Sequence, residues 1–210
     1  MAHELGHGIH DLLTHYVPLL LSHPPLIFAE TSSVFGEMIV TTKILNDAKD
    51  KNEKVFLITT KIDELYQTII RQSYFVMFEL EAHKAINEGA TIDELSKLYI
   101  MNLKSQFDNT VDIAEDFQHE WLQIPHIYHT PFYCYAYAFG NLITLALYQM
   151  YLEQGEEFVS KYIKFLSYGG SEKPMRIAAE LGIDLESEEF WNKGFRFIDK
   201  MIDELEQLVK

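Results

Sequence analysis

The sequence opens with two histidines and a glutamate whose spacing suits metal chemistry. His3, Glu4 and His7 form the pattern His-Glu-x-x-His within the stretch MAHELGHGIH. On an α-helix, residues four apart lie on one face about 5–6 Å from each other, so the two imidazoles could share one metal ion. Two imidazoles on Zn²⁺, with the intervening Glu4 as general base, form the core of a zinc hydrolase site. A helix can also carry this pattern by chance, so the spacing alone leaves the site open.

A zinc site of this kind needs a third protein ligand and one open position. The stretch PPLIFAETSSVFGEM offers Glu30, which we place just inside a second helix that can fold back on the first. Glu37 follows seven residues later on nearly the same face, where it could accept the free N–H of a zinc-bound His. Alternatively, Glu30 is a carboxylate favoured by the helix dipole and Glu37 is a surface residue.

These side chains need helices to hold them, and the sequence predicts helix after helix. Prolines and glycines mark the helix ends, and Thr91 with Glu94 forms a capping box. No run of strands with regularly spaced turns is evident, so the predicted class is all-α. We expect helices over residues 2–21, 28–45, 54–87 (one helix or two), 91–107, 132–153, 156–167, 173–181 and 188–208, with 109–131 irregular.

The composition of the chain argues against several classes of function and partner. With 210 residues and 48% hydrophobic composition, the chain can bury the core of one domain, and no linker or repeat divides it. The net charge of −15 argues against nucleic acid and anionic membrane as partners. A single cysteine excludes an intrachain disulfide and suits a reducing compartment. With no signal peptide and no membrane-spanning stretch evident, we expect a cytoplasmic location.

Four separated blocks of the chain carry a resemblance to a known family. They are HELGHGIH, FAETSSVFGE, IPHIYHTPFYCYAYAFGN and GGSEKPMRIAAELGIDL. In this order, and over essentially the whole chain, they resemble the oligoendopeptidase F branch of the thimet-oligopeptidase-like zinc metallopeptidases. The resemblance implies a zincin-type helical catalytic domain in which the two metal-ligand helices pack together. It further implies one zinc ion per chain held by His3, His7 and Glu30, with Glu4 as the base and short peptides as substrates.

The third block is expected to contact substrate, because a His and Tyr residues of this region do so in the family. Several residues of the block could fill these roles, so the register stays open by a residue or two. The candidates are His126, Tyr128, His129, Tyr133, Tyr135 and Tyr137.

The chemistry of peptide hydrolysis gives roles to this block. Attack of water on a peptide carbonyl creates an oxyanion that a positioned Tyr O–H or His N–H can stabilise. We predict that Tyr137 is the oxyanion donor and that His126 is a companion donor or contacts the substrate backbone. Tyr133, His129 and Tyr135 are predicted substrate contacts. Tyr133 and Tyr137, four residues apart, could line one face of a helix, although an aromatic stripe of this kind is more often core.

Two further residues near these motifs could be mistaken for ligands or nucleophiles. His10 follows His7 by three residues, but the Gly turn and longer spacing of a metzincin third ligand are missing. We interpret His10 as a residue that supports the zinc ligands or belongs to the core. Cys134 lies among the tyrosines, and we expect it to be a small buried residue without a catalytic role.

The resemblance also bears on domain organisation, since family members carry a large segment before the zinc motif. We therefore expect residues 1–210 to be a single C-terminal catalytic domain without the N-terminal half of the family architecture. Such a domain should self-associate through its exposed site face and be weakly active or inactive by itself. Two other functions remain open: a zinc-binding helical module without catalysis, and a helical interaction domain.

Overall fold

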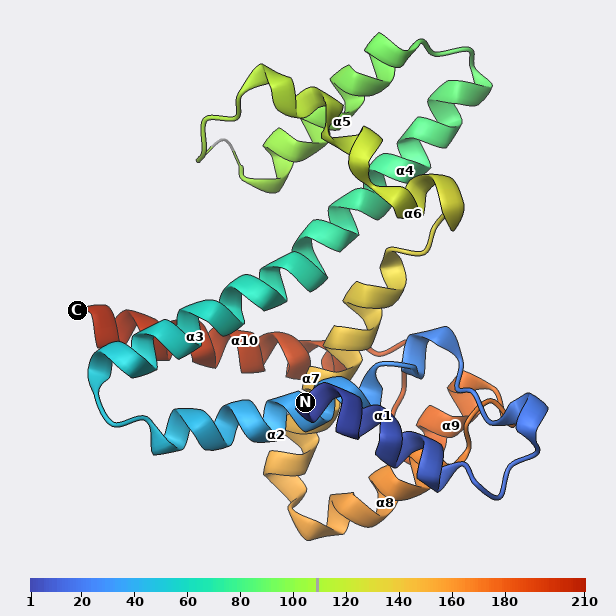
Figure 1. Ribbon diagram of the computed structural model, residues 1–210, viewed down its shortest axis with the longest axis vertical. Helices are drawn as coiled ribbons and strands as arrows, with labels where there is room; N and C mark the ends of the chain where they lie inside the picture. Colours follow the sequence, from blue (N-terminus) through green and yellow to red (C-terminus); the bar gives the residue numbers. More distant parts are fainter. Residues whose placement is uncertain (109) are drawn as a thin grey trace. The chain divides into compact units, whose positions relative to one another are not determined.

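The structure, a computed structural model, describes residues 1–108 and 110–210. Every regular element in these ranges is a helix and none is a strand, which confirms the predicted all-α class. None of the described helices combines the length and apolar character needed to cross a bilayer. The α-helices in chain order (Figure 1) are α1 (Ala2–Leu13), α2 (Thr31–Asp47), α3 (Lys51–Leu65), α4 (Arg71–Asn87), α5 (Ile92–Gln106), α6 (Pro125–His129), α7 (Tyr135–Gln154), α8 (Glu156–Ser167), α9 (Pro174–Glu180) and α10 (Glu188–Val209).

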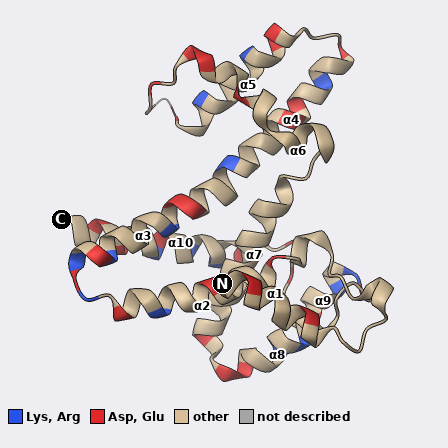
Figure 2. Ribbon diagram, in the orientation of Figure 1, with Lys and Arg blue, Asp and Glu red and all other residues tan. Residues whose placement is uncertain are grey.

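Shorter helical turns join these elements. They are the 3-10 helices η1 (Leu19–Leu21), η2 (Leu26–Phe28) and η4 (Glu115–Gln123), and the π-helix η3 (Tyr66–Ile70). Because η3 links α3 directly to α4, the long predicted helix is one continuous helical path that starts at residue 51 and contains a π-helical segment. Acidic residues are spread over most helices, with fewer basic residues among them (Figure 2).

The chain divides into two compact units. Unit 1 comprises Met1–Glu64 and Phe139–Lys210, and unit 2 comprises Leu65–Ala138. In unit 1, the ring of Phe35 from α2 stacks on Tyr162 of α8 with centroids 4.4 Å apart. In unit 2, the buried core gathers around the rings of Phe78, Tyr99 and Trp121. The prediction that all 210 residues act as one catalytic domain stays a prediction.

Several predicted helix bounds were wrong, and proline explains the largest error. The first helix ends at Leu13 instead of residue 21, with Thr14 as its C-cap. Pro18 lacks an N–H and disfavours helical conformation at the residue before it, so the chain can resume only as the short turn η1. The second helix begins at Thr31, later than predicted, and Glu30 is its N-cap residue rather than a residue inside it.

The predicted irregular segment 109–131 also needs correction. Residue 109 lies outside the described residues. Residues 110–131 contain the 3-10 helix η4 and the single α-helical turn α6, which starts with Pro125 at its first position. The helix expected from residue 132 begins at Tyr135, because Phe132 has a positive φ of 61° that no helix accommodates.

Capping signals in the sequence correctly predicted where α4 ends and where α5 begins. Thr91 and Glu94 form the predicted capping box at the start of α5. The end of α4 is a Schellman motif, in which the N–H groups of Gly89 and Ala90 donate to the carbonyls of Ile86 and Ala85. Gly89 adopts φ 90°, a conformation that glycine reaches without steric cost.

Close contact between α1 and α2 brings the two candidate ligand segments together. A Cβ added at Gly6 would lie 2.5 Å from Ser33 Cα and closer still to the carbonyl oxygen of Ser32. Contacts this short do not occur between real atoms, so only glycine permits the two backbones to approach so closely. Gly36 of α2 faces the carbonyl of Ala2 in the same crossing, where a Cβ would be 3.1 Å from the oxygen.

Because the two backbones are so close at Gly6, a larger residue there should destabilise the protein. Gly6→Ala should lower the free energy of unfolding by about 1–3 kcal/mol, because the new methyl overpacks the contact with α2. Gly8→Ala is the matched control: its Cβ would meet nothing within 4 Å, and alanine should favour the helix by up to about 1 kcal/mol. Urea unfolding followed by circular dichroism measures both. An unchanged or raised stability of the Gly6 variant would contradict the close crossing.

Candidate metal centre

The two histidines of the opening motif lie side by side on α1. Their Nε2 atoms are 3.2 Å apart and their rings meet edge to face, with centroids separated by 4.8 Å. Each side chain keeps about a third of its surface exposed, 34% for His3 and 36% for His7. The pair therefore presents two ring nitrogens to one point that solvent can reach.

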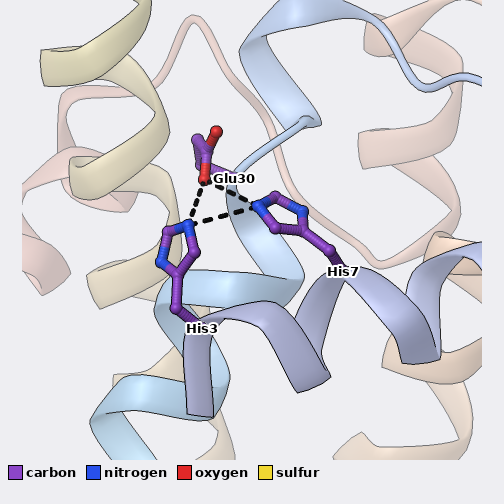
Figure 3. Close-up of side chains that lie close together, drawn as sticks. All are labelled: His3, His7 and Glu30. Carbon is purple, nitrogen blue, oxygen red and sulfur yellow. Dashed lines mark hydrogen bonds and ion pairs between the residues drawn. The ribbon is translucent and has the colours of Figure 1, made fainter. Parts of the chain in front are cut away.

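Glu30, the N-cap residue of α2, brings a carboxylate oxygen close to these two ring nitrogens (Figure 3). Its Oε2 lies 3.4 Å from the Nε2 of His3 and 3.4 Å from that of His7. The Ser33 hydroxyl donates to the same carboxylate oxygen at 2.7 Å and so fixes its orientation. Among the described residues, these three are the one group of His, Cys, Asp and Glu side chains with geometry suited to a metal ion.

The separations fit a tetrahedral zinc site. Ligand atoms at about 2.0–2.1 Å from a tetrahedral zinc ion stand about 3.3–3.4 Å from each other. The three edges between the candidate atoms measure 3.2, 3.4 and 3.4 Å. The chemistry of the donors, two imidazoles and a carboxylate, is also the kind that zinc prefers, with the fourth position left for water or substrate.

Glu37 contacts His3 from the side away from the candidate metal position. Its Oε1 lies 3.1 Å from the Nδ1 of His3. A proton on Nδ1, donated to this carboxylate, leaves Nε2 unprotonated and able to bind a metal. The placement supports the predicted role of Glu37.

Lys61 of α3 is a neighbour of this carboxylate that the sequence analysis missed. Its side chain is buried, and its Nζ lies 3.8 Å from Glu37 Oε2 and 3.0 Å from Glu64 Oε2. The ammonium group of Lys61 therefore lies beside the carboxylate that contacts His3. No spacing pattern on α3 points to a metal site, so the sequence carried no signal for this contact.

The other two predicted residues of α1 have different surroundings. Glu4 is exposed, and no residue in the described part of the chain forms a hydrogen bond or ion pair with its side chain. His10 is buried, with Nδ1 3.3 Å from the Ser32 hydroxyl. Burial lowers the pKa of His10, while the neighbouring Asp11 carboxylate opposes this shift. These surroundings favour the core interpretation of His10.

In unit 2, three residues of the predicted substrate block form a cluster, named here the His/Tyr cluster: His126, Tyr133 and Tyr137. The Oη of Tyr137 lies 3.2 Å from His126 Nε2. The His126 ring stacks on Tyr133 with centroids 5.5 Å apart, and the two tyrosine rings meet edge to face at 5.2 Å. Tyr133 precedes α7 instead of lying on it, so the expected helical stripe was wrong although the two rings still meet.

The remaining residues of the block lie apart from this cluster. Tyr135 and His129 are exposed, and Tyr128 stacks on Trp121. Cys134 is fully buried, and burial, followed by the charge of Glu79, raises the pKa of its thiol to about 11. A thiol in this environment is not an effective nucleophile near neutral pH.

The chain is similar to known peptidases. Peptidase family M3 matches the chain over residues 1–197. Oligoendopeptidase F (plasmid) of Lactococcus lactis subsp. cremoris is 31% identical over all of this chain and 35% of its own length. Oligopeptidase PepF of Bacillus subtilis is 28% identical over all of the chain and 32% of its own. The crystal structure of oligoendopeptidase-F from Enterococcus faecium superposes with a TM-score of 0.84 at 25% identity, covering 99% of this chain and 38% of that one. The chain thus spans about a third of the length of these curated relatives.

The geometry predicts one zinc ion per chain. Titration against a chromophoric chelator should show one binding equivalent, and His7→Ala should abolish stoichiometric binding. Glu37→Gln should weaken zinc affinity by about 10–100-fold, the usual effect of losing a partner that orients a metal-bound His. His15→Ala, which alters an exposed histidine just after α1, is the control. Equal zinc affinity for the His7 and His15 variants would contradict the assignment.

Proposed function

The chain belongs to peptidase family M3, and from this premise we propose that it carries the catalytic centre of a zinc oligopeptidase that hydrolyses short peptides. The observation that carries the proposal is the triangle of His3, His7 and Glu30, whose edges match the ligand spacing of a tetrahedral zinc site. One zinc ion held there would act as a Lewis acid, polarising the scissile carbonyl and making a water molecule easier to deprotonate.

Glu4 is the proposed general base. It follows His3 directly on α1 and is exposed, and no residue in the described part of the chain forms a hydrogen bond or ion pair with its side chain, so its carboxylate is free to accept a proton. In the proposed reaction it accepts a proton from the attacking water. It then returns the proton to the amine nitrogen that leaves when the peptide bond breaks.

The His/Tyr cluster is the proposed source of hydrogen bonds to the substrate. Tyr137 Oη lies 3.2 Å from His126 Nε2, and a proton on Nε2 donated to Oη would leave the tyrosine O–H able to donate to the substrate. We assign Tyr137 to the oxyanion and His126 to a companion role, with Tyr133, His129 and Tyr135 as substrate contacts. Donors aimed at a developing oxyanion are worth about 10²–10³-fold in rate in enzymes of this general kind.

We further propose that residues 1–210 act as one catalytic domain, which spans about a third of the length of the longer relatives. The relatives are about three times as long as this chain, and positioning of the substrate is a large part of catalysis. Turnover by residues 1–210 alone should therefore be low. The single, buried cysteine fits the proposed cytoplasmic location.

Glu4→Gln tests the base. The change keeps the size of the side chain and removes its ability to accept a proton. Turnover of a fluorogenic peptide by the zinc-loaded chain, measured at high protein concentration, should fall by about 10²–10⁴-fold. Zinc content should be unchanged. Asp11→Asn, an exposed carboxylate on the same helix, should leave turnover intact. Loss of zinc from the Glu4 variant, or full activity in it, would rule out this role.

We also propose that residues 1–210 self-associate, as expected from the exposed site face. A second apolar face lies on α1, about half a turn around the helix from His3 and His7. This helix exposes Leu5 (62%), Ile9 (54%) and Leu12 (76%). Leu5 and Ile9 border an apolar pocket of about 350 Å³ lined by residues of α1, α2, α7 and α8. Exposed apolar surface of this kind tends to recruit partners.

Light scattering should therefore give a mass above that of one chain, with Leu12→Lys shifting the population towards monomer. A fluorogenic-peptide assay on the same sample should show low turnover. A monomer with the turnover of an intact oligopeptidase would show that both expectations are wrong.

A further inference from the structure

A carboxylate buried in unit 2 has no role in the chemistry described so far. Glu79 lies on α4 and is fully buried, at 0% exposure. Burying a carboxylate is costly unless it gains hydrogen bonds. Its Oε1 accepts the backbone N–H of Phe132 at 2.7 Å, whereas no hydrogen-bond partner for its buried Oε2 occurs among the described residues. Core packing does not require so costly a group, so a specific task should explain it.

The residue that Glu79 contacts has an unusual backbone. Residues 130–133 form a turn in which the N–H of Tyr133 donates to the carbonyl of Thr130 at 3.2 Å. Pro131 occupies the second position, and Phe132, in the third, has a φ of 61°. This is the pattern of a type II turn, whose third position favours glycine. A phenylalanine there is strained and persists only if its surroundings hold it.

Helix α4 holds this phenylalanine in two ways. Glu79 accepts its N–H, a group that the turn itself leaves without a partner. One helical turn later, the ring of His83 packs on the ring of Phe132, with centroids 4.9 Å apart. Backbone and side chain of one strained residue are thus both fixed by α4.

The turn also connects the members of the His/Tyr cluster. It joins α6, which carries His126, to Tyr133 and to the start of α7, which carries Tyr137. The Thr130 N–H donates to the carbonyl of His126 at 3.0 Å, so the turn begins against the last turn of α6. A change of φ at residue 132 would reorient α6 relative to the start of α7. This would separate His126 Nε2 from Tyr137 Oη.

We infer that Glu79 is a positioning residue: by holding Phe132 in its left-handed conformation, it sets His126 against Tyr137. The inference deepens the proposed function, since it rests on the assignment of the His/Tyr cluster to substrate contact. Glu79 acts through the backbone of the turn, by accepting the Phe132 N–H.

Nuclear magnetic resonance of histidine-labelled protein tests the inference without needing activity. Tyr137→Phe identifies the His126 ring signal and shows its position when the hydroxyl contact is lost. Glu79→Leu should move the His126 signal towards that position. Glu79→Gln, which keeps an oxygen able to accept the Phe132 N–H, should leave it in place. An unmoved His126 signal in Glu79→Leu would overturn the inference.

Two further variants separate positioning from general stability. Ser96→Ala removes another buried acceptor of unit 2, the partner of the Trp121 Nε1–H at 3.3 Å, and should leave the His126 signal unchanged. Adding Phe132→Gly to Glu79→Leu should restore the signal, because glycine adopts the left-handed conformation without help. If Glu79→Leu alone does not fold, the double variant tests the inference. The inference then requires that the double variant folds and keeps the wild-type His126 signal. Movement of the signal in Ser96→Ala, or failure of the glycine to restore it, would assign Glu79 a merely structural role.

A measurement of kcat distinguishes failure of this inference from failure of the proposed function. If the zinc-loaded chain turns over peptide, Glu79→Leu should lower kcat by about tenfold or more, as displaced catalytic donors do. Glu79→Gln should retain kcat. If the signals behave as expected but neither wild type nor any variant hydrolyses peptide, the positioning role stands and the proposed function fails.

Discussion

The candidate metal centre depends on one steric constraint, the contact between the backbones of α1 and α2 at Gly6. The ligand atoms come from two segments more than twenty residues apart, and their separations must agree within a few tenths of an ångström for one ion to bind. Backbone contact provides this precision because it leaves no flexible side chain between the helices. Ser32 and Ser33, which meet Gly6, also contact His10 and Glu30, so packing and ligand orientation involve the same residues.

Both clusters use a carboxylate from a neighbouring helix to set the geometry of a histidine. In unit 1, Glu37 contacts the Nδ1 of His3 directly and leaves Nε2 for a metal. In unit 2, Glu79 contacts a backbone N–H in the turn that follows His126. A carboxylate suits both places, because it only accepts hydrogen bonds and so fixes the direction of the donor it meets.

Local signals in the sequence predicted much of the fold. The capping box at Thr91 and the stop at Gly89 depend on residues within one or two helical turns, so they were visible in the sequence. The end of α1 was misplaced because Pro18 already prevents the helix from continuing, and the start of α7 because a left-handed Phe132 is rare. The opening motif and Glu30 could be proposed from spacing. Lys61 and Glu79 could not, because each acts on a residue more than twenty positions away and their own helices show no pattern that marks them.

The π-helix between α3 and α4 fixes the rotational phase of the helical path. A π-turn holds about one residue more than an α-turn, and one residue corresponds to about 100° around the axis. The side chains of α4 are therefore offset from where an uninterrupted α-helix would place them. Within unit 2, Tyr66 of η3 accepts a hydrogen bond from Gln106 of α5, and Phe78 of α4 packs on Tyr99 of the same helix. Deleting one residue of η3 after Tyr66 would rotate these two side chains by about 100° relative to each other, so Tyr66 and Phe78 could no longer both face α5.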